Sequence, residues 1–147
     1  MPYRQADVSE KPVIYREAIA SGRIRLKKGT ITLIRKGELA KGDPISLAAM
    51  TAITAAKKTP EVVALCHPLR IEIIEPKVKV GDGWVEVTVR VAAHEKTGVE
   101  MEALTAVSIA LLNIWDVTKA YEKDSRGQYP STLIESIKVI SKVKGGK

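Results

Sequence analysis

The sequence predicts an α+β protein in which one sheet packs against a layer of helices. Strand-like alternation and helix-like periodicity occur in separate segments, in the order strand, helix pair, strand, strand, helix, strand. Two βαβ-type units that share one sheet give the split βαβ arrangement. We therefore expect a ferredoxin-like sandwich, with an antiparallel four-stranded sheet and helices on one face.

An N-terminal arm and one strand are predicted at the start of the chain. Residues 1–12 are polar and bounded by prolines, so we expect an arm beside a single domain of residues 13–147. Between residues 13 and 26, apolar or small side chains alternate with charged ones, which is typical of a strand. A glycine within this pattern, Gly22, indicates an interruption such as a bulge.

Two helices are predicted to follow the first strand. Residues 28–37 carry apolar side chains at helical spacing and end in a glycine, which indicates a short helix. Asp43 is placed to cap the next helix, and Pro44 to occupy its first turn. Apolar residues, mostly alanine, recur at helical spacing from residue 45 to residue 56, and the segment Lys57-Lys58-Thr59-Pro60 ends this helix.

The middle of the chain predicts a β-hairpin. Residues 69–80 are a strand candidate whose proline, Pro76, favours an edge position in the sheet. The segment Gly81-Asp82-Gly83 is typical of a hairpin turn. Valines at alternate positions from residue 85 to residue 91 then predict the most regular strand of the chain.

A long helix and a last strand complete the predicted fold. Residues 99–123 form the helix, with apolar side chains along one face. Residues 134–143 predict a strand with three apolar residues on one side, Ile137, Val139 and Val143. We expect Ile74 and Ile140 on the sheet face away from the helices. A partly apolar second face would pack against another subunit.

Composition narrows the possible classes of function. The 147 residues are 45% hydrophobic and carry a net charge of +7, which indicates a soluble folded protein with anionic partners. One cysteine and two histidines exclude an internal disulfide and a cysteine-rich zinc site. We expect no bilayer-spanning run, and therefore a cytoplasmic protein without a membrane partner. The few aromatic residues are scattered, which argues against base stacking on nucleic acid.

Two short segments in the first half suit phosphate chemistry. Lys41-Gly42-Asp43 lies at a helix start, where backbone N–H groups and a lysine attract anions, although a simple capped helix has the same pattern. Leu65-Cys66-His67-Pro68-Leu69 places His67 in a restricted turn. This histidine either binds phosphate oxygens or moves a proton, or it is a hydrogen-bonded structural residue. We interpret Cys66 as a small buried hydrophobe rather than a nucleophile.

Two further segments lie on the predicted long helix. Glu100 and Glu102 fall in its first turn. Their negative charges either interact favourably with the helix dipole, or one carboxylate accepts paired N–H donors from a ring such as guanine or a pterin. Asp116 and Lys119 face the same way, as a surface ion pair or as an acid–base pair. Glu102 and Asp116 are separated by about 21 Å of helix. A site that uses both carboxylates needs a long ligand or a second subunit.

Together these segments closely resemble the cyclic pyranopterin monophosphate synthase family, also called molybdenum cofactor biosynthesis protein C. The resemblance covers almost the whole chain, and the run from Gly98 to Thr105 is long and uncommon. Residues 124–131 match no segment of the family. The matching segments are Lys41-Gly42-Asp43, residues 65–69, residues 97–105, residues 115–120 and the closing Gly145-Gly146-Lys147.

The resemblance implies a lyase of molybdenum cofactor (molybdopterin) biosynthesis. The family converts a cyclised dihydroguanosine triphosphate into cyclic pyranopterin monophosphate, a pterin, and releases diphosphate. The resemblance also implies a ferredoxin-like fold and a homohexamer, built as a trimer of dimers with sites between subunits. It implies no resident cofactor and no metal site, although magnesium could accompany the nucleotide triphosphate.

The resemblance also implies roles for individual residues. Asp116 is the expected acid–base residue, and Lys41 and Lys119 are the expected catalytic lysines. The expected substrate-binding residues are Leu65, Cys66, His67, Met101 and Glu102, with Glu100 as the alternative carboxylate that holds the ring. The alternative function is a ferredoxin-like RNA-binding module or nucleotide-sensing oligomer, which shares the predicted topology.

Overall fold

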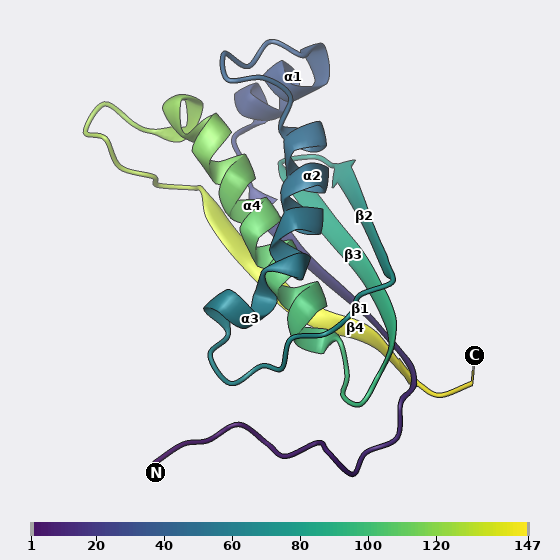
Figure 1. Cartoon of the computed structure of the whole chain (residues 1–147). Helices are drawn as coiled ribbons and strands as arrows, with labels where there is room; N and C mark the ends of the chain where they lie inside the picture. The colour runs from purple at the N-terminus through teal and green to yellow at the C-terminus, as the bar shows by residue number, and fades with distance from the viewer. Residues whose placement is uncertain (1, 147) are drawn as a thin grey trace.

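Four antiparallel strands form one sheet in the computed structural model, which describes residues 2–146 (Figure 1). The spatial order is β2-β3-β1-β4, so the two strands that are central in space are the first and third in the chain. This is the order of the split βαβ fold, and the predicted α+β class is confirmed. The strands are β1 (Ile14–Arg25), β2 (Ile73–Val80), β3 (Trp84–Glu95) and β4 (Leu133–Lys144).

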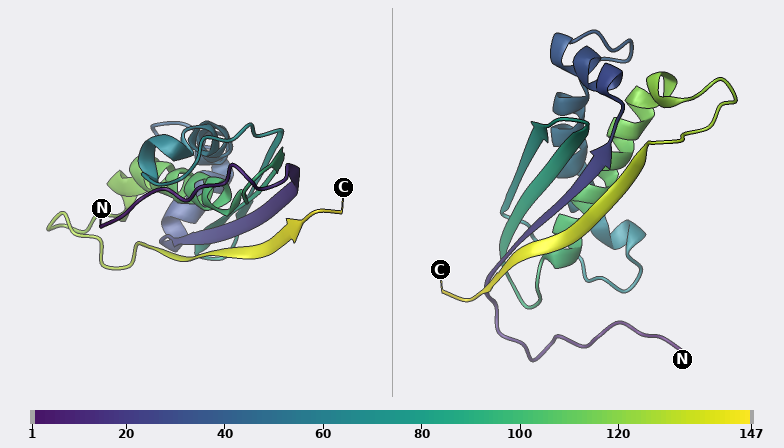
Figure 2. Two further views of the ribbon diagram at one scale, coloured as in Figure 1. Left: turned by 60° about the horizontal axis from the view of Figure 1, so that its bottom comes forward. Right: turned by 180° about the vertical axis from the view of Figure 1, so that it is seen from behind.

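Helices cover one face of this sheet (Figure 2). The two long helices, α2 and α4, lie side by side against the strands, while α1 lies at one end of the sandwich (Figure 1). Lys147, the last residue of the matched C-terminal motif, lies outside the described residues. The helices are α1 (Lys28–Lys36), α2 (Pro44–Lys57), α3 (Thr59–Val62) and α4 (Glu100–Glu122).

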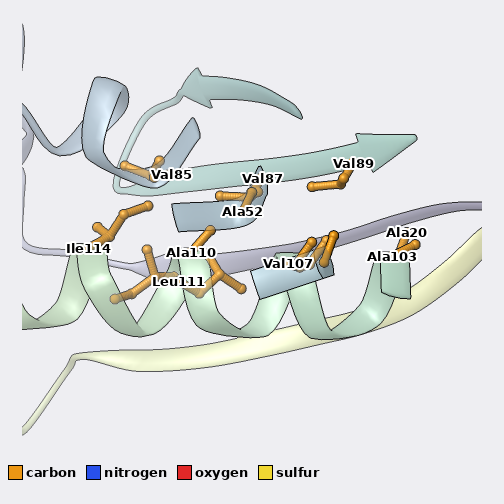
Figure 3. Close-up of a cluster of buried hydrophobic side chains, with 14 of the residues drawn as sticks. Ala20, Ala52, Val85, Val87, Val89, Ala103, Val107, Ala110, Leu111 and Ile114 are labelled. Carbon is orange, nitrogen blue, oxygen red and sulfur yellow. The ribbon is translucent and has the colours of Figure 1, made fainter. Parts of the chain in front are cut away.

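The core lies between the sheet and the helices (Figure 3). Alternate valines of β3 are fully buried, as their spacing predicted, and small residues of α2 and α4 allow the helices to approach them closely. Figure 3 shows these valines opposite Ala52, Val107, Ala110, Leu111 and Ile114. The alanine-rich sequence of α2 is therefore explained by close packing.

Two predicted boundaries differ from the structure. The strand predicted from residue 69 begins at Ile73, and the residues before it bond to β3 through the Glu72 N–H to the Ala92 carbonyl and the Arg70 N–H to the Glu95 carboxylate. A further short helix, α3, follows α2 directly and was not predicted. The segment that ends α2 contains Pro60, and a proline within the first turn suits the start of another helix.

The predicted placement of Ile74 on the second face of the sheet is wrong. Ile74 pairs with Val91, a core residue, so it faces the helices and packs against the core. Val143 pairs with Glu17 and faces away from the helices, because an irregularity between Ile19 and Ala20 shifts the register. One extra residue in a strand moves the following side chains to the opposite face.

Ion pairs occupy much of the outer sheet face instead. The Arg90 side chain contacts Glu17 and Glu75, each at 2.7 Å, and Arg23 Nε lies 2.9 Å from Glu86 Oε2. These pairs join neighbouring strands across the sheet. The same face also carries the partly exposed Val143, so charged and apolar side chains share it.

The helix α4 has the length and apolar composition that a membrane span needs, but its contacts are those of a core helix. Among the helices that the structure describes, it alone is long and apolar enough to cross a membrane by length and composition. Half of its apolar stretch is buried inside the fold, however, and it packs against β1, β3 and α2. Core packing accounts for its apolar composition.

Gly22 allows a close approach between the sheet and α4, and replacing it tests that packing. A Cβ atom at this position would lie 2.9 Å from both Ile137 Cγ1 and Leu111 Cδ1. We expect Gly22→Ala to lower the free energy of unfolding by about 1–2 kcal/mol, because the well-packed core must shift. Urea denaturation followed by circular dichroism measures this change.

Gly29 provides the matched control for this substitution. It lies in α1, and a Cβ atom there would meet nothing within 4 Å. Gly29→Ala is expected to raise stability by about 0.5–1 kcal/mol, since alanine favours the helix. Equal effects of the two substitutions would contradict the packing argument.

Candidate functional site

The loop before α2 carries Lys41 and is shaped by its neighbours. Asp43 caps α2, because its Oδ1 accepts from the Ile45 N–H at 3.0 Å and its Oδ2 from the Ser46 N–H at 3.2 Å. Gly42 has a φ angle of +110°, a conformation that favours glycine. The capped helix and this glycine turn set the path of the backbone at Lys41.

Lys41, Asp116 and Lys119 form one group, here called the lysine–aspartate cluster. The Asp116 carboxylate lies between the two ammonium groups: Oδ1 is 3.0 Å from Lys119 Nζ, and Oδ2 is 3.5 Å from Lys41 Nζ. Asp116 and Lys119 come from successive turns of α4, as their i, i+3 spacing predicted. Lys41 comes from a loop 75 residues earlier in the chain.

The electrostatics of this cluster keep Asp116 and Lys119 charged. The hydrogen bond from Lys119, with the positive charges of both lysines, holds the pKa of Asp116 below its usual range. The same hydrogen bond raises the pKa of Lys119. In the single chain Lys119 is therefore an ammonium cation rather than a neutral base.

An open cavity of about 370 Å³ lies beside the cluster. It is lined by the charged residues Asp116 and Lys119 and by the apolar residues Leu112, Trp115 and Ile134. The Trp115 ring meets Tyr129 edge to face, with 5.2 Å between ring centroids. The cavity thus places charged groups next to an apolar wall that can contact a ring or a sugar.

A second cavity, of about 290 Å³, lies at the opposite end of α4 and is here called the Cys66–His67 pocket. The residues predicted to bind substrate that line it are Leu65, Cys66, His67, Glu100 and Met101. The N-terminal arm forms part of the same lining through Ala6, Val8 and Lys11. The His67 Nε2 atom lies 2.8 Å from the Ala6 carbonyl oxygen, so the arm contacts the predicted binding residue directly.

Glu102 lies buried next to this pocket. Its side chain is only 1% exposed, and its Oε1 atom is the one buried side-chain oxygen or nitrogen without a hydrogen-bond partner among residues 2–146. Its Oε2 atom is 3.5 Å from Cys66 Sγ. Burial raises the pKa of Glu102, since a carboxylate loses hydration there.

Cys66 and Glu100 line the same pocket, but the environments that set their pKa values differ from that of Glu102. Burial and the neighbouring Glu102 carboxyl raise the pKa of the Cys66 thiol to about 11, so it is not an activated nucleophile. Burial also acts to raise the pKa of Glu100, but the Lys142 ammonium, 2.6 Å from Glu100 Oε1, outweighs burial and lowers it. Glu100 is therefore a paired carboxylate, and Glu102 is the unpaired one.

The pKa values of Glu100 and Glu102 shift in opposite directions, which predicts opposite effects of pH on the stability contributed by the two glutamates. The pKa of Glu102 is higher in the folded state than its ordinary value of 4.5. Glu102 therefore stabilises the fold at pH values below 4.5, and this contribution to stability is lost as pH rises. We expect Glu102→Gln to become more stable relative to the unsubstituted chain as pH rises above 4.5. Urea denaturation at a series of pH values measures this difference.

Glu100→Gln is the matched control for this pH series. The lowered pKa of Glu100 makes its contribution present above 4.5 and lost as pH falls. This variant should therefore become less stable, relative to the unsubstituted chain, as pH rises towards 4.5, and the difference should stay constant above that value. A constant stability difference for Glu102→Gln at all pH values would contradict the buried, unpaired carboxyl.

The two groups of predicted site residues do not meet within one chain. Figure 1 shows the end of α4 beside α1 and its beginning at the opposite end of the sandwich, towards the arm. The lysine–aspartate cluster and the Cys66–His67 pocket are therefore separated by most of the helix, about 21 Å between Glu102 and Asp116. Each group is half of the site that the sequence predicted.

The sequence patterns missed two polar residues near the cluster. Glu122 is fully buried at the end of α4, where it accepts hydrogen bonds from the Lys27 N–H and from the hydroxyls of Thr30 and Thr132. Tyr121 accepts a hydrogen bond at its hydroxyl from the Ala40 N–H, at 2.8 Å. Both look like ordinary surface positions in the sequence, because their partners are remote in the chain.

The ferredoxin-like fold and the two polar half-sites on α4 define a small α+β enzyme domain. The charged half suits a phosphorylated ligand, and the partly buried half suits a polar ring. The chain belongs to the MoaC family, whose model matches residues 5–145. The match therefore includes both half-sites.

Curated relatives support this assignment over nearly their whole length. A protein of Thermococcus kodakarensis is 52% identical over 97% of this chain and 91% of its own length. One of Sulfolobus acidocaldarius is 53% identical over 94% of this chain and 96% of its own, and one of Aeropyrum pernix is 52% identical over 95% of both. Each is named probable cyclic pyranopterin monophosphate synthase.

Proposed function

We propose that this chain is a cyclic pyranopterin monophosphate synthase, the activity for which its relatives are named. It is a lyase that converts a cyclised dihydroguanosine triphosphate into cyclic pyranopterin monophosphate and releases diphosphate. The observation that carries the proposal is the Asp116 carboxylate between the ammonium groups of Lys41 and Lys119, beside an open cavity. Such a group combines cations for phosphate oxygens with an acceptor for a proton.

The cluster supplies what the cyclising phosphoryl transfer needs. A sugar hydroxyl of the substrate attacks the innermost phosphorus, so one oxygen–phosphorus bond forms while the bond to diphosphate breaks. The hydroxyl gives its proton to Asp116, which its lowered pKa keeps ionised. Lys41 and Lys119 neutralise the charge that develops on the phosphate and diphosphate oxygens. The roles assigned to these three residues are part of the proposal.

The Cys66–His67 pocket is proposed to hold the ring derived from guanine. The free Oε1 atom of the buried Glu102 supports this assignment, because an N–H donor of a bound ring would satisfy it. Glu100 already pairs with Lys142 and serves the ring less well. His67 and Cys66, together with the apolar side chains of Leu65 and Met101, would line the remainder of the ring site.

A second copy of the chain is proposed to complete the site. The distance between the two half-sites exceeds what one compact ligand can bridge within a subunit. Two copies that place one chain's lysine–aspartate cluster against the other's Cys66–His67 pocket would remove this separation. We propose a homohexamer, a trimer of dimers with sites between subunits, and light scattering coupled to size-exclusion chromatography measures its mass.

The remaining conditions of the reaction are also proposals. Ring opening, ring closure and phosphoryl transfer exchange protons and break bonds without net redox change, so no resident cofactor is needed. Magnesium would enter only with the triphosphate substrate. A cytoplasmic location agrees with a small nucleotide-derived substrate. A chelator added to a magnesium-free assay would show whether the chain itself needs a metal.

Diphosphate release tests the proposed activity directly. Purified protein is incubated with the cyclised nucleotide, and diphosphate is measured by a coupled assay while the pterin product is oxidised and detected by its fluorescence. Stoichiometric formation of both products is expected. Absence of turnover with intact, folded protein would reject the function. The alternative of an RNA-binding or nucleotide-sensing oligomer has no support among the relatives, which are named as synthases.

A further inference from the structure

The segment between α1 and α2 has few ties along its middle. At its start, the N–H groups of Gly37 and Glu38 bond to α1 carbonyls, and at its end Asp43 caps α2. In between, the Leu39 side chain is buried, the Gly42 N–H donates to the Leu39 carbonyl at 3.2 Å across a turn, and the Ala40 N–H donates to the Tyr121 hydroxyl at 2.8 Å. Among the contacts of residues 2–146, this hydrogen bond is the one that joins the backbone next to Lys41 to α4.

Tyr121 is well placed to fix this backbone. It lies on α4, the helix that also carries Asp116 and Lys119, and its ring packs against the hydrophobic core. A tyrosine ring has only two side-chain torsions, so its hydroxyl moves little once the ring is packed. The hydroxyl thus holds Ala40, and with it Lys41, in register with the other two members of the cluster.

The ion pair between Lys41 and Asp116 cannot serve this purpose by itself. Its two closest contacts are long, at 3.5 Å to the carboxylate and 3.4 Å to the Asp116 carbonyl oxygen. Both side chains are about half exposed, and exposed ion pairs contribute little to order because solvent screens them. A long lysine side chain on a turn that was not anchored to α4 would sample many positions relative to Asp116.

We propose that Tyr121 is a positioning residue for Lys41, which it holds next to Asp116 through the Ala40 N–H. The inference rests on the proposed function for its effect on catalysis, but the contact itself is independent of that function. Tyr121 touches no substrate in this proposal. Its hydroxyl keeps Lys41 where the charge of the departing diphosphate develops, so its loss should affect the transition state more than substrate binding.

Tyr121→Phe removes only the hydroxyl and keeps the ring in the core. Loss of one neutral hydrogen bond corresponds to about a 3- to 10-fold effect. We expect kcat to fall by about this factor while KM changes less than about twofold. Amide hydrogen exchange at Ala40, followed by mass spectrometry or NMR, should become faster by a similar factor.

Tyr15→Phe is the matched control. It also removes one tyrosine hydroxyl bond, to Glu17 at 2.8 Å, but on β1 and away from the cluster. This variant should leave kcat, KM and exchange at Ala40 unchanged. Unchanged exchange at Ala40 in Tyr121→Phe, or faster exchange with an unchanged kcat, would overturn the inference.

Inorganic diphosphate separates this inference from the proposed function, because it carries in full the charge that the leaving group develops. If the unsubstituted protein does not turn over the cyclised nucleotide, the proposed function fails, and diphosphate affinity by calorimetry then decides the role of Tyr121. The inference expects Tyr121→Phe to weaken this affinity in the same direction as Lys41→Ala, and to have no further effect in the Lys41→Ala background. Weaker binding in Lys41→Ala with normal binding in Tyr121→Phe would overturn it.

Discussion

Asp116→Asn is expected to lower kcat about a thousandfold, because a positioned acid or base contributes about 10²- to 10⁴-fold to a rate. Asparagine keeps the size of the side chain but cannot accept the proton of the attacking hydroxyl. It also removes the charge that holds the Lys119 ammonium at 3.0 Å. Initial rates of diphosphate release over a range of substrate concentrations separate kcat from KM.

Substitution of either lysine partner of Asp116 should also cause a large loss of turnover while the protein stays folded. Lys41→Ala and Lys119→Ala each remove one cation from the phosphate site, and turnover should fall below detection in both. Asp82→Asn, in the exposed hairpin turn, and Lys36→Ala, in the last turn of α1, are the matched charge controls and should retain full activity. Near-normal turnover in Asp116→Asn or in both lysine variants would reject the assigned mechanism.

The largest expected loss of stability comes from Glu122→Ala. The Glu122 carboxyl is 0% exposed and joins three segments, since it accepts from the Lys27 N–H at 3.0 Å, from Thr132 Oγ1 at 2.6 Å and from the Thr30 hydroxyl. Alanine leaves these donors without their acceptor and opens a cavity. We expect the free energy of unfolding to fall by about 3 kcal/mol, measured by urea denaturation.

Two further variants show how much of the stability loss in Glu122→Ala comes from the hydrogen bonds of Glu122. Thr132→Val removes one donor while keeping the side-chain shape, and should cost about 1 kcal/mol. Glu38→Ala, at an exposed position after α1, should change stability by less than about 0.5 kcal/mol. If Glu122→Ala were as harmless as Glu38→Ala, the buried carboxyl would not connect α4 to the neighbouring segments.

The fold was largely predictable because its strands and helices have regular patterns. The alternating valines of β3 and the Asp43-Pro44 start of α2 are local signals, and both correspond to the observed elements. The errors occur where a local pattern is interrupted. The predicted face of Val143 is wrong because an irregularity in the pairing of β1 with β4 reverses the side chains that follow it.

The site was predictable only in part. The pairing of Asp116 with Lys119 follows from helical spacing, whereas the approach of Lys41 depends on a loop 75 residues away in the chain. Glu122 and Tyr121 carry no signal in the sequence, since a glutamate and a tyrosine at a helix end usually face solvent. Their importance depends on tertiary contacts with Lys27, Ala40 and Thr132 that no local pattern encodes.

Complementation between two inactive variants tests the central claim most directly. The claim is that one chain's lysine–aspartate cluster and another chain's Cys66–His67 pocket form a single site. Asp116→Asn and His67→Ala, with different affinity tags, are co-expressed and the mixed oligomers are purified through both tags. Each variant alone is expected to be inactive and to retain its oligomeric mass.

Mixed dimers of these variants would contain one intact composite site and one doubly substituted site. Random mixing therefore predicts about a quarter of the activity of the unsubstituted protein, and selection of hexamers through both tags leaves this fraction nearly unchanged, because almost every mixed hexamer carries both tags. Purified mixed oligomers that form correctly but release no diphosphate would contradict the account, because each site would then draw both halves from the same chain.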